Sequence, residues 1–318
     1  MNYLTLPHTD LRVSRLCLGT ADFGAGVSES DSFALLDQFF DAGGNFLDTA
    51  AIYAAWTPAG AGSSEKLLGK WLAKRSKNAI VATKGGHPQL DSMQLKRISK
   101  REIESDVEQS LRHLGLETID LYWLHRDDET VPVETILGAM EDLKAAGKIR
   151  FYGCSNWKTT RIQAFQSAAQ ARGAVGFVAN QPLWSLALSD LSGADPTLAA
   201  MDDAMREFHA QSGMAAIPYS SQANGYFSKL AENRALPAMF DTEKVRAPNR
   251  TRFEKVQTLG REKGLSISHI VLGYLLSQPF PVVPIIGCKN AAQLSDSLSA
   301  ADVKLSPGQV AVLARPQN

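Results

Sequence analysis

The sequence contains few cysteines and no long hydrophobic run. Among 318 residues only Cys17, Cys154 and Cys288 are cysteine, and no CxxC pair occurs. An odd number of widely spaced cysteines does not build the disulfide framework of a small secreted protein, and it fits a reducing compartment. No stretch of about 18 uncharged apolar residues is present, so we expect no membrane span. The N-terminal MNYLTLPHTD shows neither the basic nor the apolar region of a signal peptide, and we therefore expect a cytoplasmic protein.

An excess of charge of either sign is also missing. Lys and Arg together number 33, as do Asp and Glu, so the formal net charge is zero. Proteins that bind nucleic acids or anionic membrane surfaces usually carry a basic excess, and we expect neither partner here. The hydrophobic share of 44% and the charged share of 21% are ordinary for a globular protein and exclude a disordered chain.

Several common catalytic motifs do not occur. The sequence has no GxGxxG, GxxxxGK[ST], HExxH or GxSxG, and its six histidines lack the spacing of metal ligands. A bound nucleotide would therefore not be held by a Rossmann or P-loop device. Metal-dependent and serine hydrolases become less favoured classes, and we expect no metal site.

What the sequence does contain is a regular alternation of short apolar strands and amphipathic helices. After a hairpin at 2–6 and 11–13, we expect strands at 16–18, 45–48, 79–83, 119–124, 149–152, 176–180, 214–218 and 281–284. The helices expected after them span 31–42, 64–74, 100–114, 133–146, 159–171, 198–211, 251–263, 268–278 and 291–298.

Eight strand–helix units with uniformly apolar strands favour a (β/α)8 TIM barrel over an open parallel sheet. The barrel would occupy the whole chain, residues 1–318, as one domain with an N-terminal β-hairpin. Two polar stretches, 185–196 and 220–248, follow strands and are expected as loops on the catalytic face, the second as a lid.

Four polar side chains follow three consecutive strands of this barrel. Asp48 ends the second strand, Tyr53 lies five residues later, Lys84 ends the third strand and His125 the fourth. Taken singly, each has a plainer explanation, as a turn residue, a packed ring or an exposed side chain. Together, at one barrel mouth, they suit carbonyl reduction. A Lys ammonium lowers the pKa of a neighbouring phenol, a carboxylate compensates the buried ammonium, and a neutral imidazole orients the carbonyl oxygen.

At these residues the sequence resembles the aldo-keto reductase family, and the resemblance covers nearly the whole chain. Single motifs are moderately specific, whereas their ordered set is highly specific. The matching segments are LGTADFG (18–24), GGNFLDTAAIY (43–53), Ser64-Glu65, VATKGG (81–86), IDLYWLHRDD (119–128), GKIRFYGCSNW (147–157), Asn180-Gln181, IPYSSQANG (217–225) and VPIIGCKNAAQL (283–294).

The resemblance implies a role for each matching residue. Tyr53 would be the general acid, Lys84 and Asp48 its tuning pair, and His125 the group that orients the substrate. A nicotinamide cofactor is implied as well, with Tyr219 stacked on its ring. Ser155, Asn156 and Gln181 would hydrogen-bond the carboxamide. The other implied cofactor contacts, besides Asp48, are Gly19, Thr20, Ala21, Ser220, Gln222, Gly225, Gly287, Lys289 and Gln293.

The expected cofactor is NADP(H) rather than NAD(H), because Lys289 places a cation where an adenosine 2′-phosphate would bind. Many relatives carry Arg at this position and Asn near Ser297, and the acidic Asp296 would disfavour a phosphate. A further departure is Ser221, where many relatives have Pro, so the conformation of that loop is open.

The expected partner is a small carbonyl substrate, and the chain is expected as a monomer. Aromatic walls would favour apolar or ring-bearing aldehydes and ketones, although open-chain sugars fit as well. Two alternatives stay open: a regulatory subunit that binds the cofactor but hardly turns over, like the partner subunits of potassium channels, and a sugar or alcohol dehydrogenase working in the oxidative direction. The residues expected to line the mouth are Phe23, Trp56, Arg126, Trp157 and Trp184, with Trp123 lining it or pointing into the barrel wall.

Overall fold

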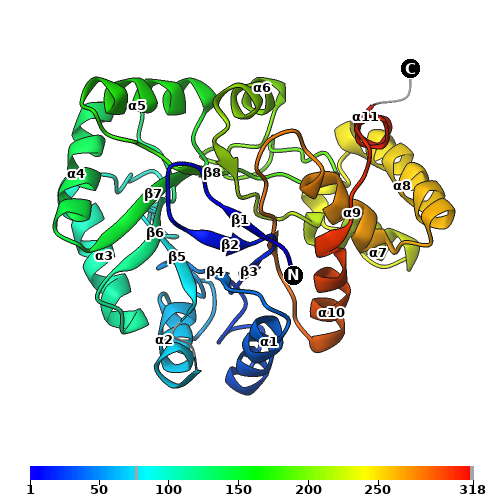
Figure 1. The fold of residues 1–318 in the computed structure, drawn as a ribbon, viewed down its shortest axis with the longest axis horizontal. Helices are drawn as coiled ribbons and strands as arrows, with labels where there is room; N and C mark the ends of the chain where they lie inside the picture. The colour runs from blue at the N-terminus through cyan, green and yellow to red at the C-terminus, as the bar shows by residue number, and fades with distance from the viewer. Residues whose placement is uncertain (76–77, 316–318) are drawn as a thin grey trace.

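Short parallel strands form the centre of the molecule, and helices surround them (Figure 1). The computed structural model describes residues 1–75 and 78–315. Within these residues the sheet has eight strands in the order β10-β3-β4-β5-β6-β7-β8-β9. The strands are β3 Cys17–Gly19, β4 Phe46–Asp48, β5 Ile80–Gly85, β6 Ile119–Leu124, β7 Ile149–Ser155, β8 Ala179–Gln181, β9 Ala215–Ala216 and β10 Ile285–Ile286.

The sheet closes on itself between its first and last members. Ile285 and Ile286 of β10 pair in parallel with β3. On the other side, Ala216 of β9 forms a parallel bridge to Val282, and the Val283 N–H donates to the Ala216 carbonyl at 3.0 Å. The expected eight-stranded (β/α)8 barrel is therefore confirmed.

The helices pack outside the barrel. They are α1 Glu29–Asp41, α2 Ser63–Arg75, α3 Lys100–Leu114, α4 Val133–Ala145, α5 Thr159–Ala171, α6 Asp203–Ser212, α7 Tyr226–Ala231, α8 Glu243–Lys263, α9 Ile267–Leu276, α10 Ala291–Ser299 and α11 Pro307–Ala314. Short 3-10 turns lie at Ala223–Gly225, Ala238–Phe240 and Ala300–Asp302.

Local sequence signals explain where these helices begin and end. In α3, Ser99 and Glu102 form a reciprocal capping box, and Gly115 ends the helix in the left-handed conformation with φ 66°. In α1 the N-cap is Ser28, whose side chain accepts from the Asp31 N–H, so the helix begins at Glu29 rather than at 31. Ser28 puts two acidic residues in the first turn, where they face the positive end of the helix dipole.

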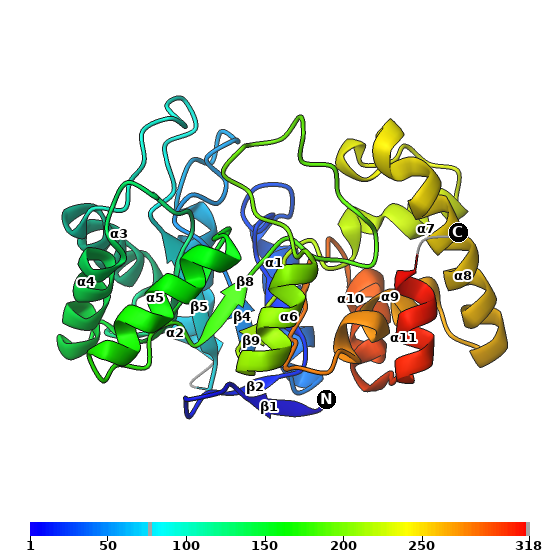
Figure 2. The same cartoon turned by 90° about the horizontal axis from the view of Figure 1, so that it is seen from above.

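A hairpin of β1 Tyr3–Thr5 and β2 Arg12–Ser14 closes one end of the barrel, opposite the long loops (Figure 2). Its Leu6, Leu11 and Val13 are buried against interior side chains that include Phe46 and Trp123. With the bottom sealed by apolar packing, the end where the strands finish is left open for binding. The cysteines Cys17, Cys154 and Cys288 are all unpaired and buried.

The later elements differ from the expectations in four places. Helix α6 starts at Asp203 rather than at 198, because Asp202 caps it there. Residues 220–248 are not one loop, since they contain α7 and the first turns of α8, which continues through Pro248. The expected last strand 281–284 pairs with β9 only through the isolated bridge at Val282, and the named strand β10 follows it at Ile285–Ile286. The C-terminal helix α11 was not foreseen.

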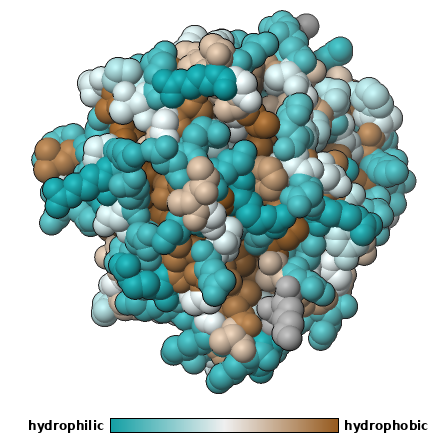
Figure 3. All heavy atoms as spheres, turned by 60° about the vertical axis from the view of Figure 1, so that its left-hand side comes forward, coloured by the Kyte–Doolittle hydropathy of each residue, from teal (hydrophilic) through white to brown (hydrophobic). Residues whose placement is uncertain are grey.

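The outer surface is mixed in character. The face in Figure 3 is covered mainly by hydrophilic side chains, with hydrophobic residues showing between them in narrow areas. None of the helices in the described parts of the chain is long and apolar enough to cross a membrane.

Candidate active site

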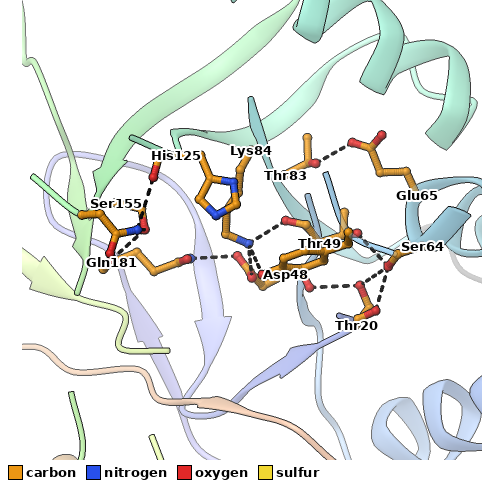
Figure 4. Close-up of polar contacts among 12 residues, drawn as sticks. Thr20, Asp48, Thr49, Ser64, Glu65, Thr83, Lys84, His125, Ser155 and Gln181 are labelled. Atoms are coloured by element: carbon orange, nitrogen blue, oxygen red, sulfur yellow. Dashed lines mark hydrogen bonds and ion pairs between the residues drawn. The ribbon is translucent and has the colours of Figure 1, made fainter. Parts of the chain in front are cut away.

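The Lys84 ammonium is the centre of a buried polar cluster at the open end of the barrel (Figure 4). Its Nζ donates to Asp48 Oδ2 at 2.5 Å, to the Thr49 carbonyl at 2.7 Å and to Tyr53 Oη at 2.9 Å. Gln181, at the end of β8, donates from Nε2 to Asp48 Oδ1 at 2.9 Å. Three strand ends thus hold one phenol hydroxyl beside one ammonium.

The alternation of β5 explains why Lys84 points inward. Its neighbour Thr83 points to the opposite face and donates to the buried Glu65 of α2 at 2.6 Å. Glu65 in turn pairs with His113 Nδ1 of α3 at 2.9 Å. Next in sequence, Gly85 lets the strand approach its neighbours, because a Cβ there would lie 2.0 Å from the Tyr122 hydroxyl oxygen. Packing on both sides therefore fixes the position of the Lys84 backbone.

The segment that carries Tyr53 is tied to the barrel by hydroxyl groups. Ser64 of α2 donates to the Thr20 carbonyl at 2.7 Å, and its Oγ lies 3.0 Å from Thr49 Oγ1. Thr20 Oγ1 also bonds the Asp48 carbonyl at 3.1 Å. Thr20 is fully buried, so its hydroxyl holds the loops after β3 and β4 together.

Burial and pairing together set the protonation of these groups. Burial raises the pKa of Tyr53, and the attraction of Lys84 for a phenolate reverses this rise only in part. Lys84 acts in the expected direction, but the net pKa is not lowered. Burial lowers the pKa of Lys84, yet Asp48 and Tyr53 outweigh it and leave that pKa raised. At neutral pH the phenol therefore keeps its proton beside a charged ammonium.

His125 lies beside this cluster as a neutral ring. Its ring centroid is 6.3 Å from that of Tyr53 and 4.8 Å from that of His87, both edge to face. Burial is the main reason that the pKa of His125 is well below its usual value, and the charges of Arg126 and Lys84 add to this effect. His87, which the sequence did not single out, has its pKa lowered to about 4, also mainly by burial.

A groove of about 860 Å³ extends from Asp48 and Tyr53 along the open end of the barrel. Twelve of the expected cofactor, catalytic and substrate residues line it: Gly19, Ala21, Phe23, Asp48, Tyr53, Tyr219, Ser220, Gln222, Gly225, Gly287, Lys289 and Gln293. The sequence did not predict the lining residues Asp22, Asn224, Ser228, Lys229, Glu232 and Arg234. Three of these are charged residues on or next to α7, a helix that was expected as loop.

One wall of the groove is a backbone segment in an unusual conformation. Ser220, Ala223 and Asn224 have positive φ angles of 50°, 51° and 53°, followed by Gly225 at 77°. The N–H groups of Ala223 and Gly225 donate to the Ser220 and Gln222 carbonyls at 2.7 and 2.9 Å, so the segment forms two tight turns. Ser221 anchors the segment, since its hydroxyl donates to the Ile285 carbonyl at 2.5 Å. A hydroxyl thus holds the loop where many relatives have Pro.

The three residues expected to bind a carboxamide lie together but are already bonded within the protein. Asn156 Nδ2 donates to the His125 carbonyl at 3.2 Å, and its Oδ1 accepts from Tyr219 Oη at 2.7 Å. Ser155 Oγ donates to the Gln181 carbonyl at 2.9 Å. A carboxamide bound here would compete with these bonds.

The residues expected to line the substrate mouth divide into two groups. Trp56 is 54% exposed and lies edge-on to Tyr53, with ring centroids 6.2 Å apart. Arg126 is buried and engaged with protein groups. Of the five expected lining residues, Phe23 lines the groove, whereas Trp56, Arg126, Trp157 and Trp184 do not. Trp157 and Trp184 belong to the core: Trp157 is fully buried and Trp184 is 5% exposed. They pack against Phe165 and Phe177, and against Tyr274 and Phe280, respectively. Trp123 is fully buried inside the barrel.

Comparison with known proteins identifies the family of the chain. The profile of the Aldo/keto reductase family matches residues 15–315. The uncharacterized oxidoreductase YrpG of Bacillus subtilis is 31% identical over 96% of this chain and 92% of its own length. Norsolorinic acid reductase stcV of Emericella nidulans is 29% identical over 96% of this chain and 78% of its own. Aryl-alcohol dehydrogenase [NADP(+)] of Phanerodontia chrysosporium is 28% identical over 96% and 83%.

Proposed function

The chain belongs to the aldo/keto reductase family and is an oxidoreductase, and from this premise we propose that it reduces the carbonyl group of aldehydes or ketones to an alcohol with NADPH. The observation that carries the proposal is the contact of the Lys84 ammonium with both Tyr53 Oη and Asp48. In this arrangement the Tyr53 hydroxyl can donate a proton, and Lys84 stabilises the phenolate that remains.

In the proposed mechanism Tyr53 is the general acid. When bound, the reduced nicotinamide supplies a hydride to the carbonyl carbon. The Tyr53 hydroxyl gives its proton to the carbonyl oxygen as negative charge develops there. The phenolate that remains is stabilised by Lys84 at 2.9 Å, and Asp48 keeps that lysine charged.

His125 orients the carbonyl oxygen in this proposal. A neutral imidazole donates one hydrogen bond without competing for the proton of Tyr53. The proposal places the carbonyl oxygen beside both side chains, whose ring centroids are 6.3 Å apart. The reaction is reversible with the same groups, so an alcohol would be oxidised by the reverse proton transfer.

The groove fits an extended dinucleotide. It begins at the catalytic cluster, passes the tightly turned backbone of 220–225 and reaches Lys289 on the loop before α10. Tyr219 lies on its wall, where a stacked ring would be placed. Lys289 supports the choice of NADPH. Its ammonium lies 3.3 Å from Asp22 Oδ2, so the Asp22 carboxylate competes with a 2′-phosphate for the lysine.

The proposed substrates are carbonyl compounds with an aromatic or apolar ring. Trp56 provides an exposed ring next to Tyr53, and Phe23, which is 1% exposed, lines the same groove as Tyr53. The names of two relatives, a norsolorinic acid reductase and an aryl-alcohol dehydrogenase, support the same substrate class.

The proposal is tested by adding a panel of aromatic aldehydes to the protein with NADPH and measuring loss of NADPH absorbance. Tyr53→Phe should reduce turnover by about 10²- to 10⁴-fold, because it removes the proton donor and little else. NADPH binding by Tyr53→Phe, followed by fluorescence, should stay within twofold of the original. Full activity of this variant contradicts the mechanism. Tight NADPH binding by the unaltered protein without turnover of any aldehyde or ketone would instead favour a regulatory subunit.

A further inference from the structure

Arg126 directly follows His125, and its guanidinium is tied into the protein at three points. Nη1 donates to the His125 carbonyl at 2.9 Å, Nε to Thr197 Oγ1 at 2.8 Å and Nη2 to Asp195 Oδ2 at 3.2 Å. The arginine side chain is 9% exposed and that of Asp195 is 23% exposed. Arg126 thus connects the end of β6 with the segment between β8 and α6, residues 182–202.

The pair lies beside the groups proposed to handle the carbonyl. The positive charge of Arg126 contributes to the lowered pKa values of His125 and His87, after burial, and it opposes the rise that burial causes in the pKa of Tyr219. The charge of Arg126 therefore influences the pKa values of His125, His87 and Tyr219.

A second contact holds the same segment in place. Asn156 donates to the His125 carbonyl at 3.2 Å, and its Oδ1 accepts from the Ala199 N–H at 3.3 Å. The segment is thus fastened at Asp195 and Thr197 by Arg126, and at Ala199 by Asn156.

Asp195 is itself held as an anion. Burial acts against this, but hydrogen bonds from the Thr197 N–H at 2.9 Å and the Thr197 hydroxyl at 2.6 Å, together with Arg126, leave its pKa below the usual value. The charge of Arg126 is therefore already balanced by the protein before a substrate arrives. A substrate carboxylate would have to displace Asp195 to gain an arginine contact.

We propose that Asp195 is a specificity-determining residue: by pairing with Arg126 it removes the free positive charge next to His125, so that the site selects neutral carbonyl compounds over those that carry a carboxylate. This inference rests on the proposed carbonyl reduction and adds to it the charge class of the substrate. It also explains how a buried arginine that bonds the His125 carbonyl does not create an acid-binding site.

Asp195→Asn separates this role from folding. The asparagine Oδ1 still accepts both bonds from Thr197, whereas its amide nitrogen faces Arg126 in place of Oδ2 and frees the guanidinium.

The matched control is Asp127→Asn. Asp127 lies in the same loop as Arg126 and pairs with Arg161 Nε at 3.0 Å, with side chains 10% and 15% exposed. Neither Asp127 nor Arg161 bonds His125 among the hydrogen bonds of the described residues.

The experiment compares benzaldehyde with 4-carboxybenzaldehyde. In the unaltered protein kcat/KM should favour benzaldehyde. In Asp195→Asn the ratio should shift by about tenfold or more toward the carboxylated aldehyde, mainly through KM, because a charge-assisted hydrogen bond to Arg126 becomes possible. Asp127→Asn should leave the ratio unchanged, and adding Arg126→Met to Asp195→Asn should abolish the shift.

Binding of benzoate, followed by its effect on thermal unfolding, tests the same proposal without turnover. Benzoate should stabilise Asp195→Asn more than the unaltered protein or Asp127→Asn. An unchanged aldehyde ratio together with equal benzoate binding in all three proteins would overturn the role of Asp195. If the unaltered protein turns over neither aldehyde, the proposed function is contradicted. Benzoate binding would in that case still test whether Asp195 neutralises Arg126.

Discussion

Lys84 Nζ lies 2.5 Å from Asp48 Oδ2, and both side chains are almost completely removed from water, with exposed fractions of 0% and 2%. Two opposite charges at this depth depend on each other, because neither has solvent to replace its partner. The pair therefore contributes to stability as well as to the proposed proton transfer.

Replacing Lys84 separates these two contributions. Lys84→Met leaves Asp48 buried without a cation, and we expect the free energy of unfolding to fall by about 3–5 kcal/mol. Turnover should fall by about 100-fold or more as the phenolate of Tyr53 loses its stabilising charge. The double variant Asp48→Asn/Lys84→Met removes both charges and should recover most of the stability but none of the turnover. Urea unfolding and NADPH oxidation measure the two effects. Equal stability of Lys84→Met and the unaltered protein would contradict the prediction.

The Asp22–Lys289 pair should influence the choice of cofactor. Both residues line the groove and are largely exposed, so their bridge adds little stability, but Asp22 competes with a phosphate for the ammonium. Asp22→Asn should raise the affinity for NADP⁺ relative to NAD⁺ by a few-fold, whereas Lys289→Met should lower it. Fluorescence titration with the two oxidised cofactors measures this ratio. If Asp22→Asn lowers the preference for NADP⁺, then Lys289 does not bind the 2′-phosphate.

His87 should make stability depend on pH. Its pKa is lowered from 6.5 to about 4 in the folded protein, so the unfolded chain takes up a proton first as the pH falls. Stability is therefore complete above pH 6.5 and decreases as the pH falls toward 4, by about 3 kcal/mol for this residue. His87→Asn, whose amide can still donate to the Pro88 carbonyl, should lose correspondingly less stability over this range.

Urea unfolding at pH 7, 5 and 4 provides the measurement, and His8→Asn is the control. His8 is exposed in the hairpin at φ 59°, a conformation that asparagine tolerates. The control should follow the pH dependence of the unaltered protein. If His87→Asn follows it as well, the lowered pKa of His87 is refuted.

Two tryptophans expected at the mouth should respond in opposite ways. Trp56 is exposed beside Tyr53, so Trp56→Ala should raise KM for aromatic aldehydes several-fold and leave stability nearly unchanged. Trp184 is buried against Tyr274 and Phe280, so Trp184→Ala should lower the free energy of unfolding by about 3–5 kcal/mol. Steady-state kinetics and urea unfolding distinguish the two. A large loss of stability in Trp56→Ala would show that this ring packs rather than binds.

The barrel and its strand-end residues were predictable because they follow local rules. Helix α3 and helix α5 have the bounds that periodicity and caps indicate. Asp48 and Lys84 are also found from position alone, since parallel strands end at one edge of the barrel. Chemistry tied to a strand end is therefore visible in the sequence.

Tertiary contacts decided what the sequence did not show. Pro248 suggests a helix boundary, yet α8 passes through it, and the next residue, Asn249, is buried and bonds the Leu188 N–H at 2.8 Å. The pairing of Arg126 with Asp195 joins residues 69 positions apart, which no local pattern indicates. An aromatic residue after a strand looks the same in the sequence whether it lines a mouth or packs in the core, and Trp157 belongs to the core.

All three cysteines are unpaired and buried, so the rate at which a thiol reagent labels them can report when parts of the chain open. Cys17 lies in β3 and Cys154 in β7, on different strands of the barrel, whereas Cys288 lines the groove near Lys289. A thiol reagent added to the native protein can modify Cys17 and Cys154 only when the barrel opens, and it reaches Cys288, which is 4% exposed, from the groove. The labelling rate of each site, resolved by peptide mass, then follows the opening of the groove and of the barrel as separate events. Filling the groove should slow the reaction at Cys288 most directly.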